Sequence, residues 1–248
     1  MISVCLASYN GQKYISVQIN SILSQLSIYD ELIIVDDCSS DNTVEIIENI
    51  NDNRIKLHVN VNNIGHVKSF EKAITLSSGE IIFLSDQDDF WFSGRVDFMS
   101  RHLYASNSSL LILTNYYTTN EQGTLQNKSL PSLFYNSSRL KNIFRVFTGS
   151  SNYYGSMMAF KRDLMHLSLP FPSFVKAHDL HLALAANIFG DVLQVNDVFT
   201  LRTITGSNLS SSNRSTLKKI IFRFFLFRSL LSLSFKKIII EFFFKESI

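Results

Sequence analysis

Three aspartates lie within four positions of the segment FLSDQDDFW, which runs from Phe83 to Trp91. They are Asp86, Asp88 and Asp89, and they directly follow an apolar stretch typical of a buried strand. Carboxylates this close repel one another and raise each other's pKa unless a cation is present. A divalent ion such as Mg²⁺ or Mn²⁺ removes the repulsion, because it prefers oxygen ligands and shares them with substrate phosphates. We therefore expect a metal at Asp86 and Asp88, which point the same way on an extended strand end.

The elements that position these aspartates are visible in the first hundred residues. Short apolar runs alternate there with segments whose apolar residues recur every three or four positions, as in helices. Asn42 and Glu45 have the spacing of a capping box at one helix start. The alternation predicts an α/β fold, with a mostly parallel sheet covered by helices on both faces. The expected strands are Ile2–Ala7, Glu31–Val35, Arg54–Val59 and Glu80–Ser85.

Polar clusters follow three of these strands, at Ser8–Asn10, Asp36-Asp37 and Asp86–Asp89. In open parallel sheets, ligands bind beyond the carboxyl ends of the strands. Loops that are merely polar would account for one such cluster, and less well for three at equivalent places. The pattern therefore predicts a ligand site at this edge of the sheet.

The second half of the chain is less regular. It contains no internal repeat and no linker rich in proline or glycine, so we expect one catalytic domain with a C-terminal extension. Residues 115–150 are predicted to form loops and short helices, and residues 206–213 a polar loop. Strands are expected at Leu110–Thr114, Ser156–Phe160 and Asp197–Arg202, and a helix at Asp179–Ile188.

Composition limits the classes of protein that fit. The 248 residues are 46% apolar and carry a net charge of only +2, so we expect no nucleic-acid partner. The two cysteines, Cys5 and Cys38, form no CxxC pair, and we interpret both as small core residues in a reducing cytosol. We see no signal peptide and no uncharged apolar run of the roughly 18–20 residues that would cross a membrane. The sequence thus predicts a cytoplasmic protein, or one attached to the inner face of the cell membrane.

The near-neutral total hides a basic tail. From Arg214 onward there are eight Lys and Arg against two Glu, whereas the preceding residues carry 15 against 19. Residues 217–245 mix aromatic and aliphatic side chains with lysine and arginine, too charged to span a bilayer and too apolar for water. We expect an interfacial helix on an anionic membrane surface. A helix packed on the catalytic domain, or a subunit contact, is the alternative.

Four segments together resemble a known family. They are VCLASYN at 4–10, IIVDDCSSDNT at 33–43, NNIG at 62–65 and SDQDDFW at 85–91. In this order they resemble the inverting nucleotide-sugar glycosyltransferases of the GT-A fold, glycosyltransferase family 2. The last segment is most similar to the branch that contains rhamnosyltransferases of bacterial surface polysaccharides. The resemblance is strong over residues 1–100.

The resemblance implies how the chain is divided and which residues hold the donor. A Rossmann-like GT-A domain would span residues 1–213, with a nucleotide-binding half (1–100) and an acceptor half (101–213), before a membrane-associating tail (214–248). Asp36 would accept a hydrogen bond from the pyrimidine N3–H, unless its charge serves only a helix N-terminus. Lys68 would approach the nucleotide, or would be a solvated helix-face lysine. The first nucleotide-contacting turn would be formed by Ala7, Ser8, Tyr9 and Asn10.

Further roles follow from the same resemblance. Asp88 would bind the metal directly, and Asp86 would lie near the ribose and the metal. Asp89 would orient its neighbours or cap a turn. Trp91 would lie near the donor sugar or in the core. Asp179 would be the catalytic base, with an ordinary helix N-cap as the alternative; His178 stands where a glutamate is more common. A loop with Arg202 and Asn208 would fold over the diphosphate, although the histidine usual between them is missing.

The implied activity is a metal-dependent, inverting transfer of sugar from a dTDP- or UDP-sugar, with rhamnose favoured. The acceptor would be a lipid-linked oligosaccharide, and the cofactor Mn²⁺ or Mg²⁺. A nucleotidyltransferase also combines a nucleotide-binding sheet with metal-binding aspartates, but usually has a glycine-rich basic loop after the first strand. Here that loop, Ser8–Lys13, holds only Gly11 and Lys13. A membrane-associated adaptor without catalysis is the third possibility.

Overall fold

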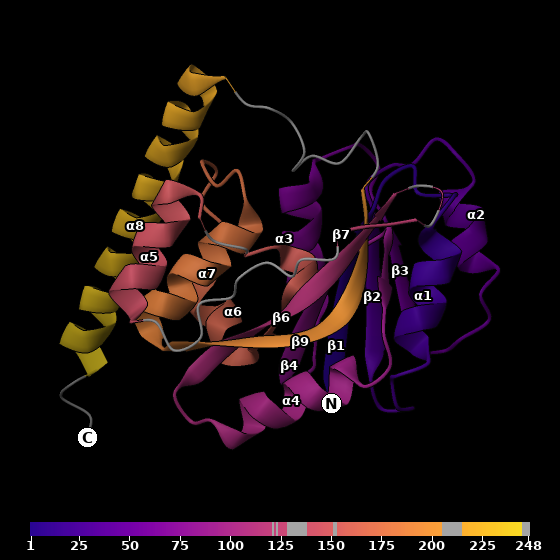
Figure 1. Ribbon diagram of the computed structural model, residues 1–248, viewed down its shortest axis with the longest axis horizontal. Helices are drawn as coiled ribbons and strands as arrows, with labels where there is room; N and C mark the ends of the chain where they lie inside the picture. The colour runs from indigo at the N-terminus through magenta and orange to yellow at the C-terminus, as the bar shows by residue number, and fades with distance from the viewer. Residues whose placement is uncertain (121, 123, 128–137, 151–152, 205–214, 245–248) are drawn as a thin grey trace.

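A computed structural model of the chain describes all residues except 121, 123, 128–137, 151–152, 205–214 and 245–248. Among the described residues, nine strands form one sheet in the order β3-β2-β1-β4-β8-β6-β9-β5, with β7 paired to β6 (Figure 1). Strands β1 to β4, β6 and β9 run in one direction, and β5, β7 and β8 run against them. The strands are β1 (Ile2–Ser8), β2 (Glu31–Asp36), β3 (Ile55–Val59), β4 (Ile81–Asp86), β5 (Asp89–Trp91), β6 (Ser109–Asn120), β7 (Leu125–Asn127), β8 (Met158–Lys161) and β9 (Asp191–Ile204).

Both faces of this sheet are covered, which explains why β1, β2 and β4 read as nearly unbroken apolar runs. Successive side chains of a strand point to opposite faces. In β4, Ile82 and Leu84 enter one core, while Ile81 and Phe83 enter the other. Helices α3, α5, α6, α7 and α8 close the first core, and α1, α2 and α4 close the second. The expected α/β fold with helices on both faces is confirmed.

The helices are largely as expected in the first half and were partly missed in the second. Asn42 does precede α2, but its side chain makes no capping hydrogen bond, so the predicted capping box is wrong. Asp41 instead accepts from the Thr43 backbone N–H at 3.0 Å. The helices are α1 (Ile15–Leu23), α2 (Thr43–Glu48), α3 (His66–Leu76), α4 (Arg95–Ala105), α5 (Arg139–Thr148), α6 (Arg162–Ser168), α7 (His178–Phe189) and α8 (Thr216–Phe244), with a 3₁₀ turn at Gly155–Met157.

Two strands of the second half are much longer than expected. Strand β6 extends to Asn120 and β9 begins at Asp191, and the two pair along most of their length with shifts in register. Figure 1 shows β9 as a curved ribbon that sweeps across the sheet. Its far end pairs with the three-residue strand β5, which was not predicted. Asp89, the first residue of β5, therefore lies directly opposite Arg202 of β9.

Helix α8 packs on the domain along one face, the alternative that the sequence had left open. Leu226 and Leu233 are buried in the first core, beside α7. Three of its cations donate to backbone carbonyls: Arg223 to Phe147, Lys236 to His166 and Lys237 to Ile188, each at 2.9 Å. In Figure 1, α8, α5 and α7 stack at the end of the molecule opposite α1 and α2.

The two cysteines differ in environment. Cys5 is buried in β1 as expected. Cys38 is exposed, so its interpretation as a core residue is wrong. It lies in the turn after β2, with a positive φ of 66°, a backbone conformation that few residues other than glycine adopt. The apolar run of β2 ends before it, at the point where the chain leaves the sheet.

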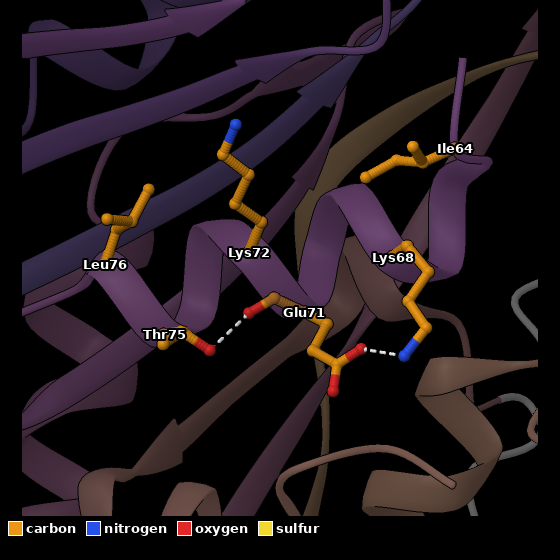
Figure 2. A pocket seen from close by; sticks show the side chains of 6 residues that line it. All are labelled: Ile64, Lys68, Glu71, Lys72, Thr75 and Leu76. Carbon is orange, nitrogen blue, oxygen red and sulfur yellow. Dashed lines mark hydrogen bonds and ion pairs between the residues drawn. The ribbon is translucent and has the colours of Figure 1, made fainter. Parts of the chain in front are cut away.

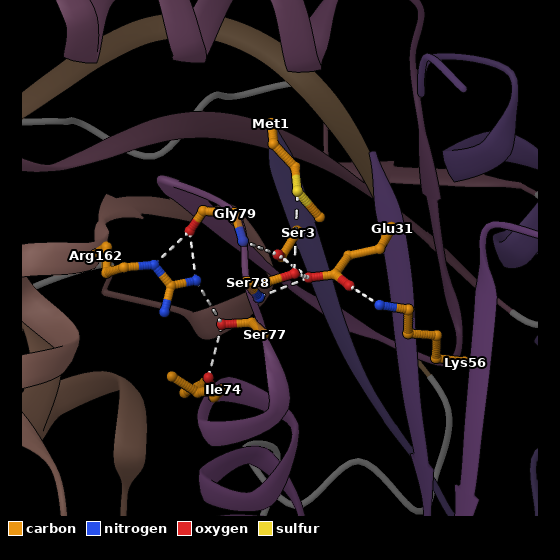
Figure 3. A network of polar contacts seen from close by, with 9 residues as sticks. All are labelled: Met1, Ser3, Glu31, Lys56, Ile74, Ser77, Ser78, Gly79 and Arg162. Atoms are coloured by element: carbon orange, nitrogen blue, oxygen red, sulfur yellow. Dashed lines mark hydrogen bonds and ion pairs between the residues drawn. The ribbon is translucent and has the colours of Figure 1, made fainter. Parts of the chain in front are cut away.

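A buried carboxylate ties the strands together at the edge opposite the polar strand ends. Glu31 is 2% exposed and accepts hydrogen bonds from the Ser3 hydroxyl, from the Ser78 N–H and hydroxyl, and from Lys56 (Figure 3). Burial alone would raise the pKa of Glu31, but these hydrogen bonds outweigh it and lower the pKa to about 2. Arg162 completes the network by donating to the Gly79 carbonyl at 2.6 and 2.9 Å.

We predict that Glu31→Gln weakens the fold. A carboxyl whose pKa is lower in the folded state stabilises the protein above its unfolded pKa and loses that effect as pH falls toward the folded value. For Glu31 the contribution at neutral pH is about 3 kcal/mol, lost between about pH 5 and pH 2. Urea unfolding at several pH values measures it. Glu48→Gln, at an exposed carboxylate on α2, is the control. Equal unfolding free energies for the two variants would contradict the prediction.

Candidate active site

The polar strand ends meet at one edge of the sheet. Strand β1 lies between β2 and β4, and its register brings Ser8 opposite Asp36 and Ala7 opposite Asp86. Backbone pairing thus sets residues from three distant parts of the chain side by side. Neighbouring strands are about 4.8 Å apart, so a single small ligand can span all three ends.

A glutamine holds the turn after β1 against the turn after β4. The Gln87 amide accepts from the Tyr9 N–H at 2.9 Å and donates to the Tyr9 carbonyl at 3.0 Å. A Cβ on Gly11 would lie 2.3 Å from Oε1 of Gln87, so only glycine fits beside this contact. Asn10, with a positive φ of 49°, accepts from the Ser40 N–H at 2.8 Å and so connects to the turn after β2. These loops therefore form one connected surface.

The two acids after β2 have separate tasks. Asp36 is fully buried and accepts from the hydroxyls of Ser8 and Ser39 at 2.8 and 2.7 Å, and from the Ser39 N–H at 2.8 Å. Contact between its carboxylate and a base would require the Ser39 turn to move aside. Asp37 accepts from the N–H groups of Ile64 and Gly65, both at 2.8 Å, and so fixes the loop that begins α3.

The motif after β4 concentrates negative charge. Burial raises the pKa of Asp86, which the nearby charges of Arg202 and His66 partly counteract. Asp89 is 4% exposed, and neither of its carboxylate oxygens has a hydrogen-bond partner among the described residues. Its pKa lies well above the usual range because of burial and the negative charges of Asp86 and Asp88. Asp88 lies in the turn between β4 and β5, partly exposed.

This charge fits a divalent cation. Two carboxylates together with substrate phosphates are the ligands that Mg²⁺ and Mn²⁺ favour. The carboxylate oxygens of Asp89, which have no partner among the described residues, fit a residue whose partner arrives with the bound ligand. Over the described ranges, no group of three or more His, Cys, Asp or Glu is arranged to hold a metal alone. The residues therefore fit a metal shared with a diphosphate rather than a closed protein site.

Positive charge reaches the site from two elements, β9 and α4. Arg202 lies opposite Asp89 on β9, and its guanidinium carbon is 4.6 Å from the centre of the Tyr154 ring. Asn208, its expected companion, lies outside the described residues. Arg95 is fully buried behind the acids, donating to the Ser156 carbonyl at 2.7 Å, and burial lowers its pKa to about 9.

The expected base lies near the acidic motif. Asp179 occupies the first turn of α7 and accepts from the Leu180 N–H at 2.8 Å. Burial raises the pKa of Asp179 to about 6; the Leu180 N–H opposes this shift, and the negative charge of Asp86 adds to it. That coupling puts Asp179 within electrostatic reach of the strand-end acids. A carboxylate with a pKa near the working pH is suited to accept a proton.

Two further candidates have other contacts. Lys68 forms an ion pair with Glu71 at 2.5 Å, on the outer face of α3. Figure 2 shows the pair in a shallow pocket whose lining is supplied by α3 and Ile64. Trp91 is 1% exposed, its ring centroid is 5.8 Å from that of Phe83, and its ring lies under the Arg95 guanidinium. Trp91 was expected either near the donor sugar or in the core, and in the structure it is a core residue.

Sequence reasoning missed several site residues. Gln87 lay unnoticed inside the acidic motif, and Asp37 was read only with Asp36. The buried charge of Arg95 has no local signal, because the sequence around it resembles an ordinary exposed helix start. His66, which senses the charges of Asp86 and Asp37, was likewise overlooked. Of these residues, only Gln87 has a sequence signal, because it lies between two aspartates at the end of a predicted strand.

The family follows from comparison with known proteins. A sequence model described as "Glycosyl transferase family 2" matches residues 3–167. The match covers the polar strand ends after β1, β2 and β4, the 3₁₀ turn at Gly155–Met157 and nearly all of α6. The chain therefore belongs to glycosyltransferase family 2, and its sheet and helices have the GT-A arrangement that the sequence motifs led us to expect.

Several relatives carry specific names. The chain is 30% identical over 142 residues to the Escherichia coli UDP-Glc:alpha-D-GlcNAc-diphosphoundecaprenol beta-1,3-glucosyltransferase WfgD, covering 57% of this chain and 56% of that protein. It is 32% identical over 116 residues to the Shigella flexneri dTDP-rhamnosyl transferase RfbG, covering 41% and 40%. The chain thus spans about half the length or less of these curated relatives.

A solved structure supports the fold. The crystal structure of S. aureus TarS 1-349 in complex with UDP-GlcNAc has a TM-score of 0.70 at 20% identity, covering 86% of this chain and 62% of that one. At this identity the likeness bears on the fold alone.

Among the described residues, none of the helices combines the length and the apolar character that crossing a bilayer needs.

We predict that the contact between Gln87 and Tyr9 supports donor binding. In Gln87→Ala the turn after β1 loses both hydrogen bonds, and nucleotide-sugar affinity should fall about tenfold, which corresponds to roughly 1.4 kcal/mol. Calorimetric titration with UDP-glucose and dTDP-rhamnose measures it. Gln25→Ala is the matched control, because Gln25 also bonds to backbone, at Ser21 and Val96, but away from the strand ends. Equal affinities in the two variants would refute the prediction.

Proposed function

We propose that this chain is a metal-dependent, inverting glycosyltransferase that moves a sugar from a dTDP- or UDP-sugar to a lipid-linked glycan in bacterial surface polysaccharide synthesis. One observation carries the proposal: Asp179 lies beside the end of β4, because a Cβ on Gly155 would be 3.7 Å from both Cβ of Asp179 and Cδ1 of Leu84. A single displacement needs a base for the acceptor hydroxyl and stabilisation of the leaving diphosphate, and Asp179 and the acids after β4 would supply these two roles.

The donor is proposed from two lines of support. The turn after β1, with Ala7, Ser8, Tyr9 and Asn10, lies beside Asp36 and Asp86 and would hold the nucleotide. The names of relatives supply the sugar: WfgD is named for UDP-Glc and RfbG for a dTDP-rhamnosyl group. The SDQDD segment followed by Trp favours dTDP-rhamnose, and UDP-hexoses are the competing donors. The diphosphoundecaprenol in the name of WfgD supports a lipid-linked acceptor.

Asp88 and Asp86 would hold Mn²⁺ or Mg²⁺ together with the donor diphosphate. When bound, the metal would act as a Lewis acid that neutralises charge on the leaving diphosphate. Arg202 would add a fixed positive charge to the same region. Because Lys68 is engaged by Glu71, its contact with the nucleotide would require that ion pair to open.

Asp179 would act as the general base for the acceptor hydroxyl. Its carboxylate would take the proton of an acceptor hydroxyl while that oxygen attacks the anomeric carbon. The bond from the anomeric carbon to the diphosphate breaks as the new glycosidic bond forms, so the configuration inverts. The proton remains on Asp179, and the nucleoside diphosphate leaves with the electron pair.

We predict that Asp179→Asn abolishes sugar transfer and leaves nucleotide affinity within about twofold of wild type, since the amide cannot accept the proton. In the wild-type enzyme, kcat/KM should rise about tenfold per pH unit up to about pH 6 and then level off, because protonated Asp179 is inactive. Product formation and calorimetry measure the two effects. Transfer by the variant would exclude Asp179 as base. Wild-type nucleotide binding without any transfer would favour an adaptor.

The donor and the metal are tested by thermal unfolding. Because a ligand that binds only the folded state stabilises it by about 2.7 kcal/mol at a hundred times its Kd, the true donor should give the largest rise in Tm among UDP- and dTDP-sugars with Mn²⁺. A chelator should remove most of the rise, and so should Asp88→Asn. Asp97→Asn, at an exposed acid of α4, is the control. A rise unaffected by chelator would exclude metal-dependent binding.

The proposed location is the cytoplasmic face of the membrane. Although one face of α8 packs on the domain, the outer face carries an exposed apolar stripe about 33 Å long at its rise per residue. Lys218 and Lys219 lie exposed at its beginning and favour anionic lipid. Such a helix lies in the membrane interface. The stripe consists of Ile220, Phe224, Phe227, Leu231, Phe235, Ile238 and Phe242.

We predict that Phe227→Ser with Leu231→Ser abolishes binding to vesicles that contain phosphatidylglycerol. Both side chains are about half exposed, so Tm should remain unchanged while cosedimentation is lost. Lys218→Glu with Lys219→Glu should weaken binding at low salt only, because screening removes the electrostatic part. A wild-type protein that does not sediment with these vesicles, or a serine variant that still does, would contradict the membrane proposal.

A further inference from the structure

His178, the first residue of α7, is a buried imidazole without hydrogen bonds. It is 6% exposed, and neither ring nitrogen has a partner within the part of the chain that the structure describes. Its ring stacks on Phe70 with centroids 4.2 Å apart, and meets the His66 ring edge-on at 5.8 Å. Apolar contacts thus hold the ring, and its two polar atoms contribute nothing to the fold.

An orphaned imidazole costs stability. Burial of a polar atom without a hydrogen bond leaves its desolvation uncompensated. A phenylalanine at position 178 would keep the stack on Phe70 and avoid that cost. Groups that weaken the free protein in this way are expected where a ligand uses them.

The surroundings of His178 point to the ligand. A Cβ on Gly155 would lie 3.1 Å from Nε2 of His178 and 3.7 Å from Cβ of Asp179. The next residue along the chain is Asp179, the proposed base, and the neighbouring His66 ring senses the charge of Asp86. His178 is therefore adjacent to the proposed base, and the ring that it contacts lies within the field of an acid assigned to the donor diphosphate.

The transferred sugar must pass between those same groups. Resting on the proposed function, we infer that His178 is a sugar-binding residue that hydrogen-bonds a hydroxyl of the transferred sugar. A neutral imidazole offers one donor and one acceptor, which matches a hydroxyl. Burial keeps the ring neutral by lowering the pKa of His178 to about 3.

The test compares His178→Phe with wild type in unfolding, binding and transfer. The variant should unfold at the same or a higher temperature and bind UDP and dTDP as wild type does. Its affinity for UDP-glucose or dTDP-rhamnose should fall about tenfold, and kcat/KM about 10- to 100-fold, because one sugar contact is lost. His178→Gln should restore part of both.

A matched control lies one turn along the same helix. His181 is 1% exposed, but its Nε2 lies 3.4 Å from the Ser168 carbonyl. His181→Phe should therefore lower Tm. The difference in affinity between a nucleotide-sugar and its free nucleotide should stay the same as in wild type. The contrast separates a structural histidine from a sugar-binding one.

The outcomes that overturn the inference are distinct from those that overturn the reaction. A lower Tm for His178→Phe, or unchanged sugar affinity and turnover, overturns it. So does a wild-type protein that binds UDP-glucose and dTDP-rhamnose no more tightly than UDP and dTDP. Wild-type sugar binding that His178→Phe weakens, without transfer to any lipid-linked acceptor, sustains the inference and overturns the proposed reaction alone.

Discussion

The parallel pairing of β1 with β2 and β4 brings Ser8 opposite Asp36 and Ala7 opposite Asp86. Every other contact at the strand-end edge depends on this register. A shift of one residue would turn the alternating side chains of β1 to the wrong cores, and it would also pull Tyr9 away from Gln87. The same hydrogen bonds that complete the sheet therefore align the acids, so the fold and the site cannot be separated energetically.

The carboxylates at this edge of the sheet repel one another unless positive charge lies nearby. Asp86, Asp88 and Asp89 come from one short segment, and the cations that approach them come from elsewhere. Arg202 arrives on β9 because β9 bends far enough to pair with β5. Arg95 lies behind them, buried against Ser156. These two arginines thus neutralise part of the charge that the segment after β4 concentrates, and a cation with a diphosphate would complete the balance.

How far the sequence could predict this arrangement depended on whether a signal was local. Strands β1, β2 and β4 were found because both of their faces are buried and their letters are almost continuously apolar, and β3 because its apolar residues alternate with polar ones. Strand β5 was missed because three residues inside an acidic motif show no period, and most of β9 because its partner β6 lies about eighty positions away. Asp86 and Asp179 could be singled out through family motifs, but their proximity required the register. The exposure of Cys38 and the burial of Arg95 depend on tertiary packing that no single residue type reports.

Three basic side chains of α8 connect this helix to the ends of three other helices. Arg223, Lys236 and Lys237 each reach a carbonyl in the final turn of another helix, on α5, α6 and α7 respectively. Those turns end in carbonyl groups that have no partner within their own helix, and positive charge there is favourable with the helix dipole. One C-terminal segment thus closes three helix ends at once. A chain shortened before residue 216 would lose all three contacts, including the one on the helix that bears Asp179, so what looks like an appendage helps to hold the domain together.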